Sequence, residues 1–227
     1  MVNKLCVDDV TDSISPIQGD CGGAIPTSTL QSFRVRPVTR FDATPFIISI
    51  HYAKRFPSIS YYFGLFDADE LIGVVCYGTP ASHSLTIGIC GKKYKSQVLE
   101  LNRLVLKYNR KNEASYLVSK SLKLLPKPKI IVSYADTSQN HVGVVYKASN
   151  FIYTGLSDKR TEWAMKGSKL HSKTICDSYS LEHRKSNDQF YLIDRPRKHR
   201  YIYFLGNKKQ KKQYLLDLKY NVKEYPK

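Results

Sequence analysis

The sequence predicts a mixed α/β fold in one domain, with a basic extension at its carboxyl end. Strand-like and helix-like segments alternate between Val98 and Tyr153, which is the order of a sheet whose parallel strands are connected by helices. The chain has 227 residues, 42% of them hydrophobic, enough for one well-packed domain. We expect a loose amino-terminal arm at 1–31, a core at 32–156, and a basic region at 157–227 that completes the domain.

The first ordered elements are expected to be an edge strand and a helix. Phe33–Val38 alternates polar and apolar side chains, and Pro37 marks the segment as an edge or the end of a strand. Asp42 and the Thr44–Pro45 pair are N-cap and first-turn signals, which predict a helix that starts at Asp42 and runs to about Ala53.

A hairpin should follow. Tyr61–Phe66 and Leu71–Tyr77 are strand-like and are separated by a short polar turn. We interpret 78–95 as a loop over the functional site. The five cysteines are widely spaced and contain no C-x-x-C pair, which argues against a disulfide framework or a cysteine-rich zinc site. Cys76 lies in an apolar run and is expected in the core.

The second half of the chain predicts a parallel strand pair. Val98–Leu106 alternates polar and apolar residues, Glu113–Leu125 has helical spacing, and Lys129–Ala135 is rich in β-branched residues. A second helix over 141–149 and a short strand over 151–153 complete the pattern. A strand–helix–strand unit of this kind pairs its two strands in parallel through a right-handed connection.

Ligands of such sheets bind at the carboxyl ends of the strands. The loops at 107–112 and 136–140 should meet at that edge. The polar residues expected there are Asn112, Ser115, Asp136, Asn140 and His141. A lone histidine in a loop is more often a hydrogen-bonding residue than a metal ligand. No histidine spacing predicts a metal site, so we assign none, although a site assembled from distant residues stays open.

Charge points to a polyanionic partner. Lys and Arg outnumber Asp and Glu by 36 to 19, for a net charge of +17, which favours nucleic acid. No apolar run approaches the roughly 20 residues that span a bilayer. The first 31 residues carry early aspartates rather than a secretory signal, so we expect a cytoplasmic protein without a membrane partner.

The positive charge is concentrated near the carboxyl end, where 156–227 contains 18 Lys or Arg and 8 Asp or Glu. Two basic runs there are expected to bind DNA phosphates, and the aromatic residues after the first run form either a stacking surface or an ordinary strand. The two runs are Arg195, Arg197, Lys198, His199 and Arg200, and then Lys208, Lys209, Lys211 and Lys212.

The segment Asn140–Phe151 resembles the later helix of the Gcn5-related N-acetyltransferase fold, which carries an Asn and a Tyr, here matched by Asn140 and Tyr146. That resemblance implies an acyltransferase-like domain. The usual Q/R-x-x-G-x-G/A phosphate loop is absent, and Asn109–Ser115 stands in its place. A helix start flanked by Arg110 and Lys111 is still suited to an anion.

A narrower resemblance covers the chain from about Arg34 to its carboxyl end. Several blocks in the same order resemble phage Mom proteins: Leu99–Leu104, Asn112–Ser115, Ser133–Asp136, Gly143–Phe151, Arg195–Tyr203 and Tyr225–Lys227. The family implies an enzyme that converts adenine to N6-carbamoylmethyl-adenine in phage DNA and so protects it from host restriction. It would act in the cytoplasm of the infected bacterium.

By this resemblance the catalytic candidates are Asp136, Ser115 and Tyr77, of which Asp136 is the general base if burial raises its pKa. The cofactor candidates are Asn112, Ser115, Asn140, His141 and Tyr146. Asp136 and Ser115 also fit ordinary turn and helix-capping roles. Arg103 is a candidate for binding DNA or for an ion pair with Glu100.

The target adenine should be flipped out of double-stranded DNA into a pocket that Tyr77 or Tyr108 could line. The donor stays open between acetyl-coenzyme A and an aminoacyl donor such as a charged tRNA, as does the oligomeric state. Two other functions also stay open. One is an acetyltransferase for a protein or small amine, and the other is a non-catalytic DNA-binding protein on the same scaffold.

Overall fold

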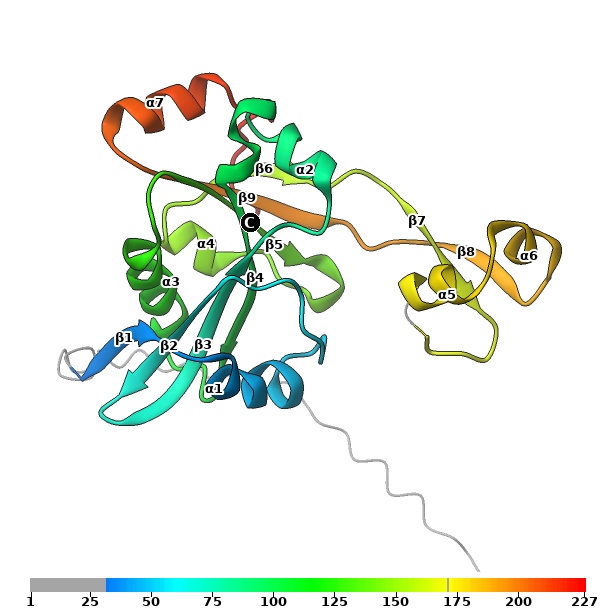
Figure 1. The fold of residues 1–227 in the computed structure, drawn as a ribbon, viewed down its shortest axis with the longest axis horizontal. Coiled ribbons are helices and arrows are strands. Elements are labelled where there is room, and N and C mark those ends of the chain that lie inside the picture. Colours follow the sequence, from blue (N-terminus) through cyan, green and yellow to red (C-terminus); the bar gives the residue numbers. More distant parts are fainter. Residues whose placement is uncertain (1–31, 171) are drawn as a thin grey trace, which may run out of the picture. The chain divides into compact units, whose positions relative to one another are not determined.

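The computed structural model describes residues 32–170 and 172–227. The arm expected at 1–31 lies outside the described residues. One compact unit spans Ser32–Lys227, and Figure 1 shows helices packed against a twisted sheet.

The main sheet has seven strands in the order β1-β2-β3-β4-β5-β9-β6. Only β4 and β5 pair in parallel, and the other neighbours pair antiparallel. This confirms the mixed α/β class. The strands are β1 (Phe33–Pro37), β2 (Tyr61–Asp67), β3 (Glu70–Gly78), β4 (Val98–Leu106), β5 (Lys129–Asp136), β6 (Ile152–Leu156) and β9 (Lys198–Leu205).

The amino-terminal elements are of the types predicted from the sequence, a strand and a helix, but their boundaries differ from the prediction. Helix α1 (Arg40–Pro45) begins at Thr39, whose side chain accepts from the backbone N–H of Asp42 in a reciprocal capping box. It continues into the π-helical turn η2 (Phe46–Ile50). The predicted start at Asp42 is therefore wrong, because Asp42 is the third residue of the helix rather than its cap.

The segment 78–95 is not a loop over the site. It contains α2 (His83–Gly88) and leads into the 3₁₀ helix η3 (Lys92–Gln97). Ile89 and Cys90 follow α2 and are buried against one face of the sheet together with Tyr214 from α7 (Lys208–Leu216). The segment covers a hydrophobic cluster, and none of its residues lines the pocket described below.

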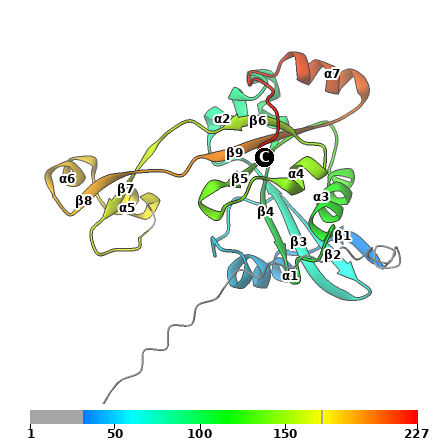
Figure 2. The same cartoon turned by 180° about the vertical axis from the view of Figure 1, so that it is seen from behind.

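The opposite face of the sheet is covered by α3 (Glu113–Leu124) and α4 (Val144–Ala148), as Figure 2 shows from behind. Leu117, Val118 and Leu122 of α3 are buried there. Helix α4 is shorter than predicted because Gly143, at φ 78°, ends the preceding loop in a left-handed conformation. Between β5 and α4 lies the short 3₁₀ turn η4 (Thr137–Gln139).

Strand β9 lies between β5 and β6, although in the sequence about 60 residues separate it from β5 and about 40 from β6. Its register pairs Lys198 with Asp136 and Leu205 with Lys129. Because β9 runs antiparallel to β5, its first residues lie at the carboxyl end of β5 and α7 follows at the amino end.

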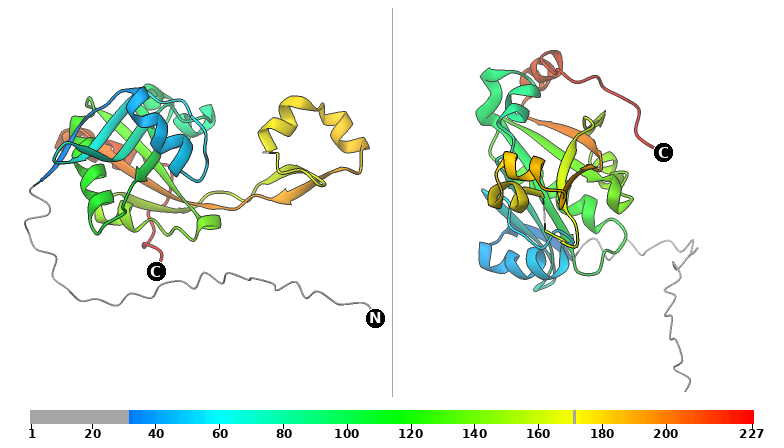
Figure 3. Two further views of the ribbon diagram at one scale, coloured as in Figure 1. Left: turned by 90° about the horizontal axis from the view of Figure 1, so that it is seen from below. Right: turned by 90° about the vertical axis from the view of Figure 1, so that its right-hand side faces the viewer.

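A second sheet is formed by β7 (Thr161–Met165) and β8 (Phe190–Asp194). Helices α5 (Ser172–Ser178) and α6 (Leu181–Ser186) lie in the connection between these strands, as Figure 3 shows. Two-stranded sheets are marginal alone, and here Phe190 and Ile175 are buried where the hairpin contacts these helices.

Candidate active site

The candidate site is a pocket that opens where β4 and β5 separate. The two strands pair only from Val98–Leu101 with 130–133. Beyond that point β4 stays with β3 and β5 stays with β9. The Ser133 hydroxyl donates to the Leu101 carbonyl oxygen at 3.0 Å where they part. The pocket has a volume of about 670 Å³, which is within the usual range for ligand sites.

The pocket brings together five of the residues singled out from the sequence: Arg103, Asp136, Asn140, His141 and Tyr146. Asp136, Asn140 and His141 follow from the carboxyl-end rule, since they lie at or just after the end of β5, whereas Tyr146 was singled out by the resemblance of its helix. Asn112 and Ser115 are not in the lining, where α3 is represented by Ala114. The Ser115 hydroxyl donates to the Asn112 carbonyl oxygen at 3.2 Å, so it is an ordinary first-turn residue and its catalytic assignment is not supported.

Tyr77 is also outside the pocket. Its side chain is fully buried in the core, and its hydroxyl lies 2.7 Å from that of Ser121 on α3. Burial raises the pKa of Tyr77, so the phenol stays protonated within the core. Tyr108, the other aromatic proposed for a base pocket, is half-exposed and donates to Glu70 at 2.8 Å.

The Asp136 side chain lines the pocket, and both of its carboxylate oxygens already have ion-pair or hydrogen-bond partners. Lys198 approaches its Oδ2 at 2.7 Å, and its Oδ1 accepts from the backbone N–H and hydroxyl of Ser138. Burial alone would raise the pKa of Asp136, but the bonds from Lys198 and Ser138 outweigh burial and lower it. The condition under which the sequence offered Asp136 as general base, a pKa raised by burial, is therefore not met. Burial instead raises the pKa of Glu100, although Lys198 and Arg103 lie nearby.

Two polar atoms of the pocket wall lack partners. Within 32–170 and 172–227, only Asn102 Oδ1 and Arg103 Nε are buried side-chain atoms without a hydrogen bond. The orientation of the Asn102 amide is fixed because its Nδ2 donates to the Ser58 carbonyl oxygen at 2.8 Å. Arg103 donates to the carbonyl oxygens of Asn102 and Arg55. Both atoms are shielded from solvent within residues that line the pocket, so the wall contains one unused acceptor and one unused donor, which are costly to leave unpaired.

His51 and Tyr52 complete the wall from the segment after η2. Their rings stack with centroids 4.4 Å apart. Burial, with repulsion from Arg103 and His141, lowers the pKa of His51 to about 4. His51 Nδ1 accepts from the Ala53 backbone N–H at 3.0 Å, so the neutral ring carries its proton on Nε2. Sequence reasoning missed both residues because nothing local links them to the ends of β4 and β5.

Tyr146 lies at the base of the pocket on α4 and is almost fully buried. A hydrogen bond joins it to the Ser133 side chain, and burial raises the pKa of Tyr146 to about 12. Its phenol is thus a donor at neutral pH. The sequence placed Tyr146 correctly through its position in the helix after β5.

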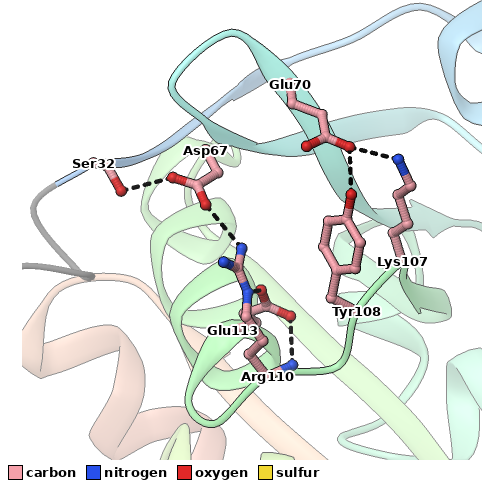
Figure 4. Close-up of polar contacts among 7 residues, drawn as sticks. All are labelled: Ser32, Asp67, Glu70, Lys107, Tyr108, Arg110 and Glu113. Atoms are coloured by element: carbon pink, nitrogen blue, oxygen red, sulfur yellow. Dashed lines mark hydrogen bonds and ion pairs between the residues drawn. The ribbon is translucent and has the colours of Figure 1, made fainter. Parts of the chain in front are cut away.

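The start of α3 is the position where the resemblance implies an anion, and Figure 4 shows that the chain fills it with its own carboxylate. Glu113 is fully buried, and its carboxylate accepts from the Arg110 backbone N–H at 2.7 Å and from Arg110 Nε. Arg110 also pairs with Asp67 at 2.9 Å. A carboxylate in this place satisfies the helix dipole. The residues here therefore do not fit a coenzyme A pyrophosphate.

The first basic run has mixed roles. Arg200 is almost fully buried, donates to Thr154, and lies 3.4 Å from the centroid of the Tyr220 ring. Its assignment to DNA contact is therefore wrong, since it holds the carboxyl-terminal segment in place. His199 bonds the Tyr153 hydroxyl at 2.7 Å.

Three further cations lie just before or at the start of β9. Lys198 pairs with Asp136, Arg197 donates to the Ser157 carbonyl oxygen, and Arg195 lies 3.7 Å from Glu162. Arg195 is half-exposed and stays suited to phosphate contact.

The second basic run lies in α7, and its four lysines are exposed. An asparagine cap at Asn207 with Gln210 starts this helix. By the register of β9 it lies at the end of β5 opposite the pocket. The sequence predicts DNA contact for both basic runs, and the structure places them at opposite ends of β5.

Among the described residues, no three His, Cys, Asp or Glu side chains gather in a way that would hold a metal ion. Cys76, Cys90 and Cys176 are free thiols, and Cys76 is buried in the core as predicted. No helix of the described ranges is long and apolar enough to cross a membrane.

Comparison with solved structures finds acetyltransferases. A Bacillus subtilis acetyltransferase in complex with CoA is 13% identical, with a TM-score of 0.44, over 76% of this chain and 99% of that one. Arabidopsis thaliana NAA60 in complex with acetyl-CoA is 14% identical, with a TM-score of 0.45, over 76% of this chain and 98% of that one. Likeness at this level carries no information on a donor.

Comparison with characterised sequences is more specific. The methylcarbamoylase Mom of Escherichia phage Mu is 28% identical over 207 residues, which are 87% of this chain and 85% of that protein. The Mom protein family matches residues 32–227, which include every strand of both sheets and the whole pocket. The chain belongs to the Mom protein family.

Proposed function

We propose that this protein is a transferase that converts adenine in phage DNA to N6-carbamoylmethyl-adenine and so protects that DNA from host restriction. Membership of the Mom family and the similarity to a methylcarbamoylase support the class of reaction. The observation that carries the assignment to a site is the pair of unpartnered atoms, Asn102 Oδ1 and Arg103 Nε, in the pocket between β4 and β5.

These two atoms suit one edge of the target base. Adenine offers a donor, the N6 amine, beside a ring-nitrogen acceptor. Asn102 Oδ1 would accept from N6, and Arg103 Nε would donate to the ring nitrogen. Tyr52 supplies an aromatic surface for stacking beside this pair. Pairing and stacking bury N6 in a duplex, so the base must leave the helix to reach the pocket.

The N6 lone pair is delocalised into the ring, so its proton must leave as the new bond forms. The nitrogen gains positive charge during attack, and its proton then becomes acidic enough for a carboxylate of low pKa. We assign Asp136 as the acceptor, with Lys198 and Ser138 holding it in place. The His51 Nε2–H is a donor for a developing oxyanion. The Tyr146 phenol donates to Ser133, whose own proton goes to the Leu101 carbonyl oxygen, so it would serve as a second donor only by turning away from Ser133.

The donor is an acyl-type compound, and its chemistry favours an aminoacyl ester such as a charged tRNA. A glycyl group is isomeric with carbamoylmethyl. Attack of N6 on a glycyl ester forms the N6–carbon bond, breaks the ester carbon–oxygen bond, and releases the alcohol. Rearrangement of the glycyl group then needs no added atom. Acetyl-coenzyme A lacks the amide nitrogen, and Glu113 already accepts from the Arg110 backbone N–H and side chain at the start of α3, where the resemblance implies its pyrophosphate.

DNA would approach along the carboxyl end of β5, where Lys198 pairs with Asp136 and the half-exposed Arg195 precedes Lys198 by three residues. The partner is double-stranded DNA. The reaction would occur in the cytoplasm of the phage-infected bacterium, where phage DNA meets host restriction enzymes.

The test is to co-express the protein with a plasmid, digest the DNA to nucleosides, and analyse them by mass spectrometry. We expect an adenine nucleoside heavier by one carbamoylmethyl group. Normal adenosine from cells with soluble, folded protein would overturn the proposal. An acetylated protein or small amine in the same cells would favour the acetyltransferase function. DNA binding without any modified base would leave a non-catalytic binding protein.

A further inference from the structure

The end of the molecule opposite the pocket carries a dense group of lysines from two separate segments. Residues 92–97 and 207–219 together contain eight lysines and one acidic residue. All eight lysines are exposed. We call this group the η3–α7 lysine surface, and it consists of Lys92, Lys93, Lys95, Lys208, Lys209, Lys211, Lys212 and Lys219.

Specific contacts hold the two segments together. Tyr94 of η3 and Tyr214 of α7 meet edge to face with ring centroids 5.1 Å apart. The Tyr214 hydroxyl donates to Gln97, and the Lys219 backbone N–H donates to the Ile89 carbonyl oxygen at 2.9 Å. The lysines therefore stand on a preformed surface. Figures 1 and 2 both show α7 beside α2, the helix that leads into η3.

The acidic residue of these segments does not neutralise the surface. Asp217 pairs with Lys93 at 3.0 Å and accepts from the Tyr94 hydroxyl at 2.6 Å. These bonds, with one from Gln213, lower the pKa of Asp217 to about 2. It stays ionised, but its charge is shared with a single lysine. Seven lysines are left for a polyanion, whose phosphates release counterions on binding.

The surface is too far from the pocket to touch the same phosphates. The pocket lies at the Asp136 end of β5 and α7 follows the strand that ends opposite Lys129. Seven residue steps of β-strand span about 23 Å. Duplex DNA rises about 3.4 Å per base pair, so about seven base pairs cover that distance.

We propose that the η3–α7 lysine surface is a second binding site for the phosphate backbone of duplex DNA, about seven base pairs or more from the adenine in the pocket. The proposal rests on the proposed function only for the position of that adenine. Backbone contact of this kind adds affinity and salt dependence without reading sequence. It also explains why the second basic run lies apart from the first.

The test compares two triple variants that remove equal charge. Lys208→Gln with Lys209→Gln and Lys212→Gln removes lysines of the surface. Lys111→Gln with Lys120→Gln and Lys123→Gln removes exposed lysines in and just before α3. Binding is measured by fluorescence anisotropy over a series of salt concentrations, with thermal unfolding as a check on folding. The probes are duplexes of about 12 and about 30 base pairs with one mismatched, easily extruded adenine at the centre.

For the 30-base-pair duplex we expect the α7 variant to bind about ten- to a hundredfold more weakly than the natural protein. The slope of log affinity against log salt should become shallower by about 2 to 3. The 12-base-pair duplex extends only about six base pairs from the adenine, so its affinity should not change. The α3 variant should bind both duplexes as the natural protein does.

Three results would overturn the proposal. They are unchanged binding of the long duplex by the α7 variant, an equal loss in the α3 variant, and preferential binding of single-stranded RNA to this surface. If instead length-dependent binding is lost as expected, but the natural protein modifies no adenine, the surface stands and the proposed function fails.

Discussion

Tyr52 lies half-exposed in the pocket wall with its ring stacked on His51. If it stacks on the target base, Tyr52→Ala should lower the rate of adenine modification by about ten- to a hundredfold, since such stacking contributes about 1–3 kcal/mol per base. Tyr52→Phe keeps the ring and should keep most of the activity. Initial rates on a mismatched duplex measure the difference. Equal rates for the Ala and Phe variants would remove Tyr52 from the base site.

The lowered pKa of His51 makes the stability of the folded protein depend on pH. Its pKa is lowered to about 4, so between that value and its usual 6.5 the unfolded chain binds a proton that the folded chain does not. Stability then falls as pH falls through this window. The natural protein should lose about 1 kcal/mol more than His51→Gln between about pH 7 and pH 5, after allowance for partial exposure. Urea unfolding at both pH values measures this, and identical losses would contradict the shift.

Among single residues, the sequence located Asp136, Asn140 and His141, because the carboxyl end of a parallel strand is a local feature that a pattern reveals. Tyr146 came from the resemblance of its helix. It could not locate Asn102 as a pocket residue. Whether its amide is satisfied depends on Ser58, a residue 44 positions away. The direction of the pKa shift of Asp136 could not be predicted for a similar reason, since Lys198 reaches it from a strand 62 residues later in the chain.

The contacts at the start of α3 predict how much this helix start contributes to the stability of the protein. Glu113→Gln removes a fully buried carboxylate that accepts from Arg110. The loss of charge-assisted bonds should destabilise the protein by about 1.5–3 kcal/mol. Asp67→Asn, which changes the more exposed partner of the same arginine, should cost about 1 kcal/mol or less. Chemical denaturation measures both, and equal costs would show that Glu113 does not secure the helix start.

Gly143 sets the path into α4. It has φ 78°, and a Cβ there would lie 2.5 Å from the Tyr201 ring. Gly143→Ala should therefore cost more than the roughly 1 kcal/mol of a left-handed alanine alone. Gly167→Ala is the matched control, since Gly167 has φ 70° and open space around it. Thermal unfolding should show a clearly larger loss at Gly143, and equal losses would contradict the packing argument.

Elements with strong local signals were predictable. The strands of the hairpin, β4, α3 and β5 follow from alternation, helical spacing and stop signals. The structure of the segment 78–95 was not predictable, because α2 has only six residues and ends in glycine. The burial of this segment also depends on Tyr214, more than 120 residues away. The Ser82 cap and the spacing of Leu85 and Ile89 were the available signals.

Across the whole molecule, the insertion of β9 between β5 and β6 determines where the basic side chains lie. It brings Lys198 to Asp136 at one end of β5 and α7 to the other end. Pairing between distant strands leaves no periodic trace in the sequence, so the sequence could not show that the two basic runs lie at opposite ends of β5. A protein of this charge should bind DNA with a steep salt dependence.

The central claim is that the pocket between β4 and β5 modifies adenine. Its most direct test is the yield of modified adenosine, measured by mass spectrometry of plasmid DNA from cells that express the natural protein, Asn102→Ala or Asn221→Ala. Asn221 is exposed in the carboxyl-terminal segment and serves as the control. We expect N6-carbamoylmethyl-deoxyadenosine from the natural protein and Asn221→Ala, and at least about a tenfold loss in folded Asn102→Ala. No modified adenosine from the natural protein, or an equal yield from Asn102→Ala, would contradict the claim.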